Sequence, residues 1–355
     1  MLAQLPLEII DQVIESLSFK DIGAIACVCS ALRQPAQFRL FRTISIRNVV
    51  ETGDTTPSHN KIVLPHPNLL QYASRLVVEE PHVFIGDQRV ISSIHSLWPH
   101  FPTMYRLTYV ELALGRSNHA VALSTLEGLG LTREIELNLM HPLTPDLVFS
   151  DKPLPVRSLS IPVNIASDQV TRRLLQKCSQ SLRKLHLSPQ MNRVPSLPPL
   201  PQLCELSLCG KFGGSDLELA IWFPFLDQHP TITRLSMDAQ YTLAVPTPPN
   251  ILPNLQSLES TTMVSQHLIP GRPVHDLRAK YYFDTSPQYP VEDMFQVLRL
   301  SNVPLTILEI STYHTLQCEG LIKILKTVPK LRKFTLNKPH YNVCQLLKAG
   351  VFKSD

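Results

Sequence analysis

The chain has 355 residues, of which 44% are hydrophobic and 17% charged, which is enough apolar material for a large core in one or two domains. Lys+Arg 33 and Asp+Glu 29 leave a net charge of only +4, with no basic run. This balance gives no indication of binding to nucleic acid. The longest apolar run, residues 22–32, has about half the length of a membrane span, so no membrane partner is expected.

The seven cysteines are scattered and form no Cys-x-x-Cys pair, and the first residues, MLAQLPLEIID, lack the basic start of an export signal. Both features indicate an intracellular protein in a reducing compartment. We therefore expect it in the cytoplasm, the nucleus or both.

The segment 5–46 predicts three short helices that lead into a strand. In the first helix, Pro6 stands at the start and Ile9, Ile10 and Ile14 recur at helical spacing. Asp21 is placed to cap a second helix over 22–32, and a third over 35–41 precedes a strand at 42–46. Three helices of this length make a small core, and such modules generally need a partner to be stable.

Residues 47–70 are polar, contain three prolines, and predict a linker that reaches the first strand region. From residue 71 to 355 a short motif recurs at intervals of 19 to 31 residues. It has the pattern apolar-x-x-apolar-x-apolar, is often preceded by proline, and is called the phrase below. Its middle apolar residues are Leu76, Leu107, Ile135, Leu159, Leu185, Leu206, Leu235, Leu258, Leu277, Leu308 and Phe334.

At the end of each phrase apolar and polar residues alternate, as they do in a strand with one buried face. Segments in which apolar residues recur at helical spacing lie between the phrases. Asp168 and Asp216 are predicted to cap two of these helices. The pattern resembles the leucine-rich repeat, an α/β solenoid with a parallel sheet on the concave side and helices outside. An ordinary α/β domain with Leu-rich strands is the alternative.

The opening stretch LPLEIIDQVIESLSFKDIGAIACVCSAL resembles an F-box, and the chain as a whole is similar to fungal F-box proteins with degenerate leucine-rich repeats. The resemblance implies a three-helix F-box over residues 1–46 and a repeat domain over 71–355. It also implies docking on a Skp-type adaptor and, through it, on a cullin. The residues expected to face the adaptor are Leu5, Pro6, Ile9, Ile10 and Ile14.

The function implied is substrate recognition for a Skp–cullin–F-box ubiquitin ligase, with the chemistry left to the partners. No nucleophile elbow, phosphate-binding glycine loop or His-Glu-x-x-His motif is present, and the histidines match no metal-ligand spacing. We therefore expect no catalytic residue, cofactor or metal. A repeat scaffold that does not engage a ligase is the alternative.

Because side chains alternate along a strand, the residues between the buried leucines should project from the concave sheet. Both signs of charge occur along this row, which favours a protein substrate over nucleic acid. The residues expected to bind the substrate are Lys184, His186, Arg234, Asp238, Asp276, Arg278, Lys280 and Glu309.

Overall fold

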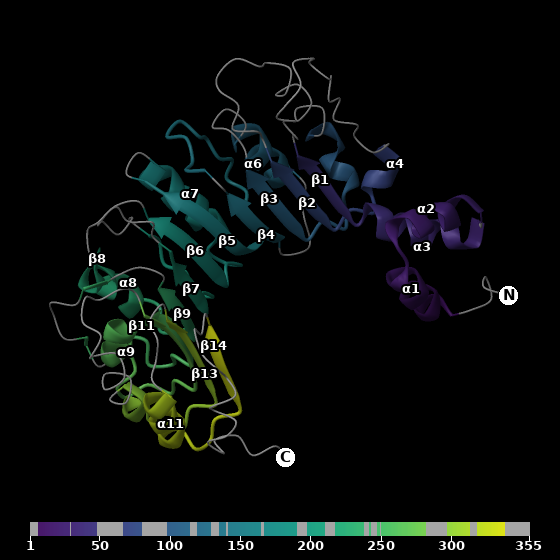
Figure 1. Cartoon of the computed structure of the whole chain (residues 1–355). Helices are drawn as coiled ribbons and strands as arrows, with labels where there is room; N and C mark the ends of the chain where they lie inside the picture. Colours follow the sequence, from purple (N-terminus) through teal and green to yellow (C-terminus); the bar gives the residue numbers. More distant parts are fainter. Residues whose placement is uncertain are drawn as a thin grey trace, which may run out of the picture. The chain divides into compact units, whose positions relative to one another are not determined.

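The computed structural model divides the chain into two compact units, residues Met1–Ile161 and Pro162–Asp355, and each is described by itself (Figure 1). The residues that the structure describes are 6–28, 30–47, 67–79, 98–113, 119–128, 135–139, 141–164, 167–189, 197–209, 217–237, 241–242, 247–248, 250–281, 297–312 and 318–337. No helix among them is both long enough and apolar enough to span a bilayer.

The first unit begins with a helical module followed by a parallel sheet. The module consists of α1 (Leu7–Ser16), α2 (Phe19–Val28) and α3 (Ser30–Phe41). The hydrogen-bonded strands follow in chain order: β1 (Thr43–Arg47), β2 (Arg75–Glu79), β3 (Tyr109–Ala113), β4 (Ile135–Leu139) and β5 (Val156–Val163). The helical connections are α4 (Pro67–Leu70), the 3-10 helix η2 (Trp98–Thr103) and α6 (His119–Gly128).

The second unit continues the same scheme of parallel strands in chain order. Its sheet holds β6 (Lys184–Pro189), β7 (Glu205–Leu208), β9 (Arg234–Met237), β11 (Ser257–Thr261), β12 (Asp276–Tyr281), β13 (Ile307–Thr312) and β14 (Lys333–Asn337). A separate pair is formed by β8 (Leu217–Glu218) and β10 (Tyr241–Thr242).

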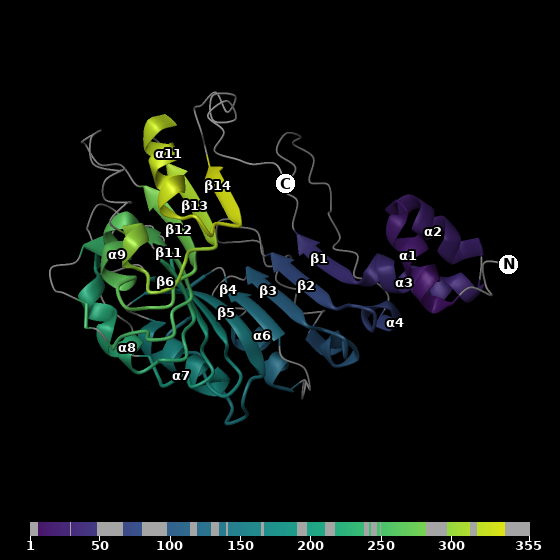
Figure 2. The ribbon, with the colours of Figure 1, turned by 90° about the horizontal axis from the view of Figure 1, so that it is seen from below.

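Helical segments cover one face of the second unit's sheet and leave the other face open (Figure 2). They are α7 (Asp168–Cys178), the 3-10 helix η5 (Leu219–Trp222), α8 (Phe223–Asp227), α9 (Thr262–Leu268) and α11 (Cys318–Thr327). In both units a parallel sheet with helical connections is consistent with the α/β solenoid predicted from the repeat.

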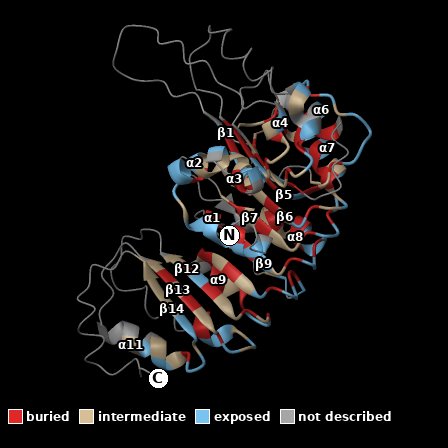
Figure 3. Ribbon diagram, turned by 90° about the vertical axis from the view of Figure 1, so that its right-hand side faces the viewer, coloured by how far each residue is buried: buried red, intermediate tan, exposed pale blue. Residues whose placement is uncertain are grey.

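The apolar phrase of the second unit lies in the predicted register. The middle residue of each phrase is the Cα partner of the next, from Leu185 through Leu206, Leu235, Leu258, Leu277 and Leu308 to Phe334. All of these except Phe334 are buried. Buried and partly exposed residues consequently alternate along β12 and β13 (Figure 3).

Two phrases of the first unit lie in a different register from the one predicted. The partner of Leu76 is Val110, and the partner of Val110 is Leu137. Leu107 is fully buried but precedes β3, and Ile135 lies two residues before the aligned position. Both phrases contain further apolar residues at spacings of two and three, so the sequence pattern fits more than one register.

A backbone contact repeats at the start of the strands. In the second unit, the carbonyl oxygen of the residue just before a strand accepts two N–H bonds of 2.8–3.1 Å from the start of the next strand. We call these oxygens the pre-strand carbonyls; in this unit they belong to Arg183, Cys204, Thr233, Gln256, His275 and Thr306. Arg42 and Ser74 make the same contact in the first unit.

Small polar side chains reinforce the pre-strand carbonyls. The hydroxyls of Thr108, Thr233 and Thr306 each donate to the pre-strand carbonyl of the preceding strand, at 3.1 Å, 3.3 Å and 3.2 Å. The thiol of Cys204 donates to the carbonyl of Arg183 at 3.3 Å. These positions therefore join successive strands through both backbone and side chain.

Two predicted helix caps are wrong: the cap of α2 lies three residues before the predicted one, and the cap of α7 lies one residue before it. Ser18, not Asp21, caps α2: its hydroxyl accepts from the N–H of Asp21 at 3.3 Å and donates to that carboxylate at 2.5 Å. A serine followed three residues later by an acid is the spacing of a capping box, and here the acid accepts from the serine hydroxyl instead of from the backbone N–H of the cap residue. Ser167 holds the cap position of α7, and Asp168 is in its first turn, where an acid still favours the helix dipole. Asp216 lies outside the described residues.

Two buried polar side chains tie neighbouring segments of the second unit together. The guanidinium of Arg272 donates to the carbonyls of Ile251, Pro270 and Pro248, at 2.7 Å, 3.0 Å and 3.2 Å. The ring of His229 donates from Nδ1 to the carbonyl of Phe225 at 2.6 Å. Its Nε2 accepts from the N–H of Leu200 at 2.9 Å, so the ring is neutral.

The described cysteines Cys27, Cys178, Cys204 and Cys209 are free thiols. Burial raises the pKa of Cys178 to about 12, so this thiol stays protonated and packs as a small apolar side chain in α7.

Because the buried ring of His229 is neutral, the stability of the second unit depends on pH. Burial lowers the pKa of this ring below 6.5, while the bond to the Phe225 carbonyl acts in the opposite direction. The unfolded chain therefore takes up this proton at a higher pH than the folded chain, and the free energy of unfolding falls as pH drops below about 6.5.

His229→Gln should be less stable than the wild type at neutral pH, by about 1 kcal/mol, because its hydrogen bonds are imperfectly replaced. Its melting temperature should nevertheless fall less than that of the wild type between neutral pH and about pH 5.5. His267→Gln, at a partly exposed histidine of α9, is the control. If His229→Gln follows the wild-type pH curve, His229 does not contribute to the acid sensitivity.

Candidate functional site

The helical module has a small core of its own. Its buried residues come from all three helices and are Ile10, Ile14, Ile22, Leu32 and Ala36, with Leu17, Ile25, Ala26 and Leu40 packed around them. Arg39 of α3 lies 3.8 Å from Glu15 of α1 at the periphery. The three helices thus close on one another through Ile10 and Ile14 of α1, Ile22 of α2, and Leu32 and Ala36 of α3.

The same module leaves large apolar side chains in contact with solvent. Ile9 is 41% exposed, Val13 is 42% exposed and Phe19 is 71% exposed. Ile9 and Val13 stand four residues apart on α1, so they share one side of this helix. We call Ile9, Val13 and Phe19 the exposed apolar row. Fully burying an exposed side chain of this size stabilises a complex by roughly 1.5–3 kcal/mol, and Ile9 and Val13, already more than half covered, would each contribute about half of that or less.

Of the residues predicted to face the adaptor, some are exposed and others are buried in the core of the module. Pro6 is exposed at the N-cap of α1, and Ile9 is exposed on the helix. Ile10 and Ile14 are instead only 8% and 3% exposed, because the period of the helix turns them toward α2 and α3. Leu5 lies outside the described residues. Val13 and Phe19 were not selected from the sequence.

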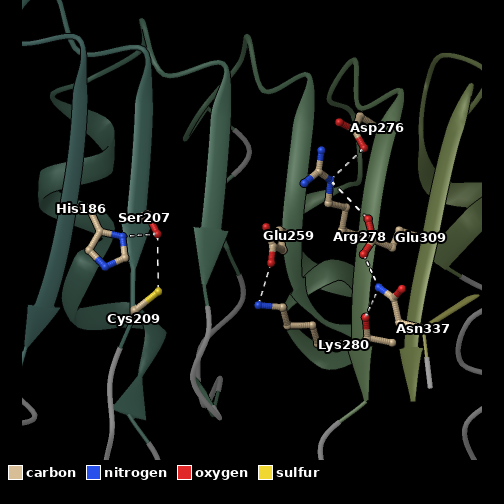
Figure 4. Close-up of polar contacts among 10 residues, drawn as sticks. His186, Ser207, Cys209, Glu259, Asp276, Arg278, Lys280, Glu309 and Asn337 are labelled. Atoms are coloured by element: carbon tan, nitrogen blue, oxygen red, sulfur yellow. Dashed lines mark hydrogen bonds and ion pairs between the residues drawn. The ribbon is translucent and has the colours of Figure 1, made fainter. Parts of the chain in front are cut away.

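The open face of the second unit's sheet holds most of the residues predicted to bind the substrate (Figure 4). Lys184 and His186 project from β6, Arg234 from β9, and Glu309 from β13. The residues Asp276, Arg278 and Lys280 all come from β12. Asp238 lies outside the described residues.

At β6, β7 and β9, two cations share one carboxylate. Lys184 Nζ lies 3.2 Å from Glu205 Oε2, and Arg234 Nη1 lies 3.9 Å from the same oxygen. The strand register places Glu205 directly between Lys184 and Arg234. One carboxylate balances only one of the two positive charges.

At β11 to β14, cations and carboxylates form two groups of contacts. Arg278 Nε lies 3.7 Å from Asp276 Oδ1 and 3.8 Å from Glu309 Oε2, while Lys280 Nζ lies 2.6 Å from Glu259 Oε1. The amide of Asn337 donates to the Glu309 carboxylate and to Ser311 Oγ (Figure 4). The group around Arg278 thus joins β12, β13 and β14, and the Lys280–Glu259 pair joins β12 to β11.

His186 belongs to a third group of polar side chains. Its Nδ1 lies 3.0 Å from Ser207 Oγ, which lies 3.6 Å from Cys209 Sγ. Across the described residues, no group of three or more His, Cys, Asp or Glu side chains could hold a metal ion. The open face therefore offers charges, hydroxyls and a ring for hydrogen bonding with a ligand.

The first unit's sheet carries an open-face cluster that the sequence analysis did not select. The guanidinium of Arg75 lies 4.3 Å from the ring centre of Tyr109, and Arg75 Nη2 lies 3.8 Å from Glu111 Oε2. The Tyr109 hydroxyl donates to the same Glu111 oxygen at 2.8 Å. Partial burial and this bond raise the pKa of Tyr109. The alternation that placed Lys184 on the open face would have found this cluster had β3 been placed in its observed register.

The comparison with known protein families identifies the helical module. A family model of the F-box domain matches residues 2–34, which span α1, α2 and the start of α3. F-box domains bind Skp1-type adaptors, which lead to a cullin, and F-box proteins are typically non-catalytic subunits of ubiquitin ligases. No curated protein matches the chain significantly. The chain thus carries an F-box domain at its N-terminal end.

The two ion-pair groups of the open face should differ in strength. Lys280 and Glu259 are close and partly buried, so a double-mutant cycle with Lys280→Met and Glu259→Gln should give a coupling of about 0.5–1 kcal/mol. The longer, more exposed Arg234–Glu205 contact should give a coupling of roughly 0.2 kcal/mol or less in the matching cycle. Equal couplings from urea unfolding would contradict the geometry.

Proposed function

We propose that the protein is the substrate-recognition subunit of a Skp–cullin–F-box ubiquitin ligase. In this proposal residues 1–46 contain the module that docks on the adaptor and most of β1, residues 47–70 are a linker, and residues 71–355 form a target-binding domain of degenerate leucine-rich repeats. The observation that carries the proposal is the F-box match at residues 2–34 on a module that exposes an apolar row. The protein would work without a catalytic residue or cofactor of its own, in the cytoplasm or the nucleus.

Within the module, one set of residues would contact the adaptor and another set would hold the fold together. The exposed apolar row of Ile9, Val13 and Phe19, with Pro6, would contact the adaptor because these side chains have no partner large enough to bury them in the described chain. Ile10 and Ile14 would contribute indirectly, because they fix α1 against α2 and α3. Replacing a core residue should therefore affect folding as well as adaptor binding.

The open face of the sheet is the proposed target surface. Backbone hydrogen bonds already occupy the edges of each strand within the sheet, so the outward side chains are what a target would meet. Charged groups of both signs on this face suit a folded or extended polypeptide of mixed charge, and a partner of this kind matches the role of a substrate receptor.

The adaptor-binding proposal predicts a specific loss of complex formation. Ile9→Asp and Val13→Asp should each weaken co-purification of the full chain with a Skp-type adaptor at least about tenfold, because a charge replaces an apolar side chain that the adaptor would bury. The α1 core stays intact, so the melting temperature of the free chain should change little. The measurement is co-expression followed by pulldown and titration.

Asp11→Arg is the matched control, because it changes charge on α1 at a position about 200° around the helix from Ile9. It should bind the adaptor as the wild type does. Unimpaired binding by both Ile9→Asp and Val13→Asp would refute the assigned docking row, and absence of binding by the wild type would favour a scaffold outside the ligase.

A further inference from the structure

The apolar core of the second unit is less covered at its last strand than at the others. In each strand phrase, three side chains lie on the helical side of the sheet: the middle residue, the one three positions before it and the one two positions after it. From β6 to β13, the pair β8–β10 aside, these three positions are at most 3% exposed in every strand. The same positions at β14 are all partly exposed; they are Leu331, Phe334 and Leu336, which we call the terminal triplet.

The helix that leads into β14 is also incompletely covered. Ile322 and Leu325 of α11 are partly exposed, whereas Val264 and Leu268 of α9 are 1% and 0% exposed. Among the described strands, β14 pairs with β13 alone. The end of a solenoid needs a cap, because each repeat buries its apolar side chains against its neighbours. The cover for this end therefore comes from outside the described residues.

The order of elements in the second unit shows how a helix that follows a strand is placed. The helix α9 begins directly after β11 and contacts both β11 and β12. Residues 313–317 separate β13 from α11. Both helices lie on the covered side of the sheet (Figure 2). By the same scheme, a helix that follows β14 would lie on the helical side of this strand and extend past it, where the terminal triplet is open.

Residues 338–355 lie outside the described residues, and part of their sequence carries the signals of a helix. In the stretch KPHYNVCQLLKAG, residues 338–350, Pro339 stands where a first helical turn accepts proline, and Gly350 stands where a helix commonly ends. A helix over residues 340–349 would be about 15 Å long. The strand β14, Lys333–Asn337, spans about 17 Å, so the two lengths match.

One side of this segment is apolar, as a cover for the terminal triplet needs to be. Val343 and Leu347 are four residues apart, so they share one side of a helix, and Cys344 lies next to them. Gln345 lies about 160° around the helix from Leu347, on the polar side. Attachment to β14 gives the segment an effective concentration of about millimolar at the terminal triplet, which favours it over a second copy of the chain.

We propose that residues 340–349 form a helix that packs Val343, Cys344 and Leu347 against the terminal triplet and closes the core of the second unit at β14. A helix of this length is marginal on its own in water, so it forms because of this packing. The inference involves neither the adaptor nor a target, so its failure would leave the proposed ligase function untouched, and the reverse also holds.

The native thiol of Cys344 reports the packing. In the full chain, Cys344 should react with N-ethylmaleimide at least about tenfold more slowly than the cysteine introduced by Gln345→Cys in a Cys344→Ser background, because the packing covers only position 344. The rates are read by mass spectrometry of the labelled peptides. Cys178, fully buried in α7, reports whether the unit stays folded. Equal rates at positions 344 and 345 would overturn the inference.

Variants of β14 test where the helix packs. Leu336→Ala should raise the labelling rate of Cys344 at least about threefold, because it removes part of the surface that the helix contacts. Thr335→Ala, on the open side of the same strand, is the matched control and should leave the rate unchanged. If Leu336→Ala also makes Cys178 reactive, the smaller change Leu336→Val takes its place. A Cys344 rate that the Leu336 variants do not change would contradict the assigned contact.

Thermal stability gives an independent readout. Leu347→Asp should lower the melting temperature of the full chain by at least about 3 °C, because it places a charge against the apolar end of the core. Gln345→Asp adds the same charge on the opposite side of the segment and should change the melting temperature little. Equal shifts from the two variants would count against the inference.

Other occupants of this end give different results. If a second copy covers it, the chain sediments as a dimer, and Cys344 in the diluted monomer reacts as fast as the cysteine at position 345. If the adaptor covers it, Cys344 is protected only in the complex. Either result would refute the proposal, whereas protection of Cys344 in the monomeric chain without adaptor would support it.

Discussion

The fold depends on the pre-strand carbonyls. Each of these oxygens binds two N–H groups at the start of the next strand, so the register of one strand dictates the register of the following one. In the second unit this places Leu206 between Leu185 and Leu235, and so on through the sheet. Because side chains alternate, burying the leucines on the helical side necessarily directs the charged residues to the open side.

The helical module obeys a different constraint, the small size of its core. The five buried residues of its core come from all three helices, and helices of this length leave Val13 and Phe19 exposed. The surface left over is apolar and sits on residues that match an F-box. In the proposed function a partner protein covers this surface, and the charged sheet face remains available for a target. Docking and recognition then rely on separate chemistry, one apolar and one ionic.

The sequence predicted the parallel strands and the leucine register of the second unit, because proline and Leu spacing there admit only one alignment. It failed at Leu107 and Ile135, where neighbouring apolar residues permit two alignments and only strand pairing decides between them. It predicted the F-box but assigned Ile10 and Ile14 to its surface, since helical spacing identifies an apolar side and not what covers it. The polar links of Arg272 and His229 to backbone carbonyls carry no sequence signal, because any nearby backbone can supply these acceptors.

The most direct test of the central claim is hydrogen–deuterium exchange of the full chain with and without a Skp-type adaptor. The account predicts that the adaptor slows exchange in peptides from α1 and α2, where the exposed apolar row lies, and leaves the exchange of β6 to β14 unchanged. Protection that appears on the sheet strands while α1 and α2 exchange as in the free chain would contradict it.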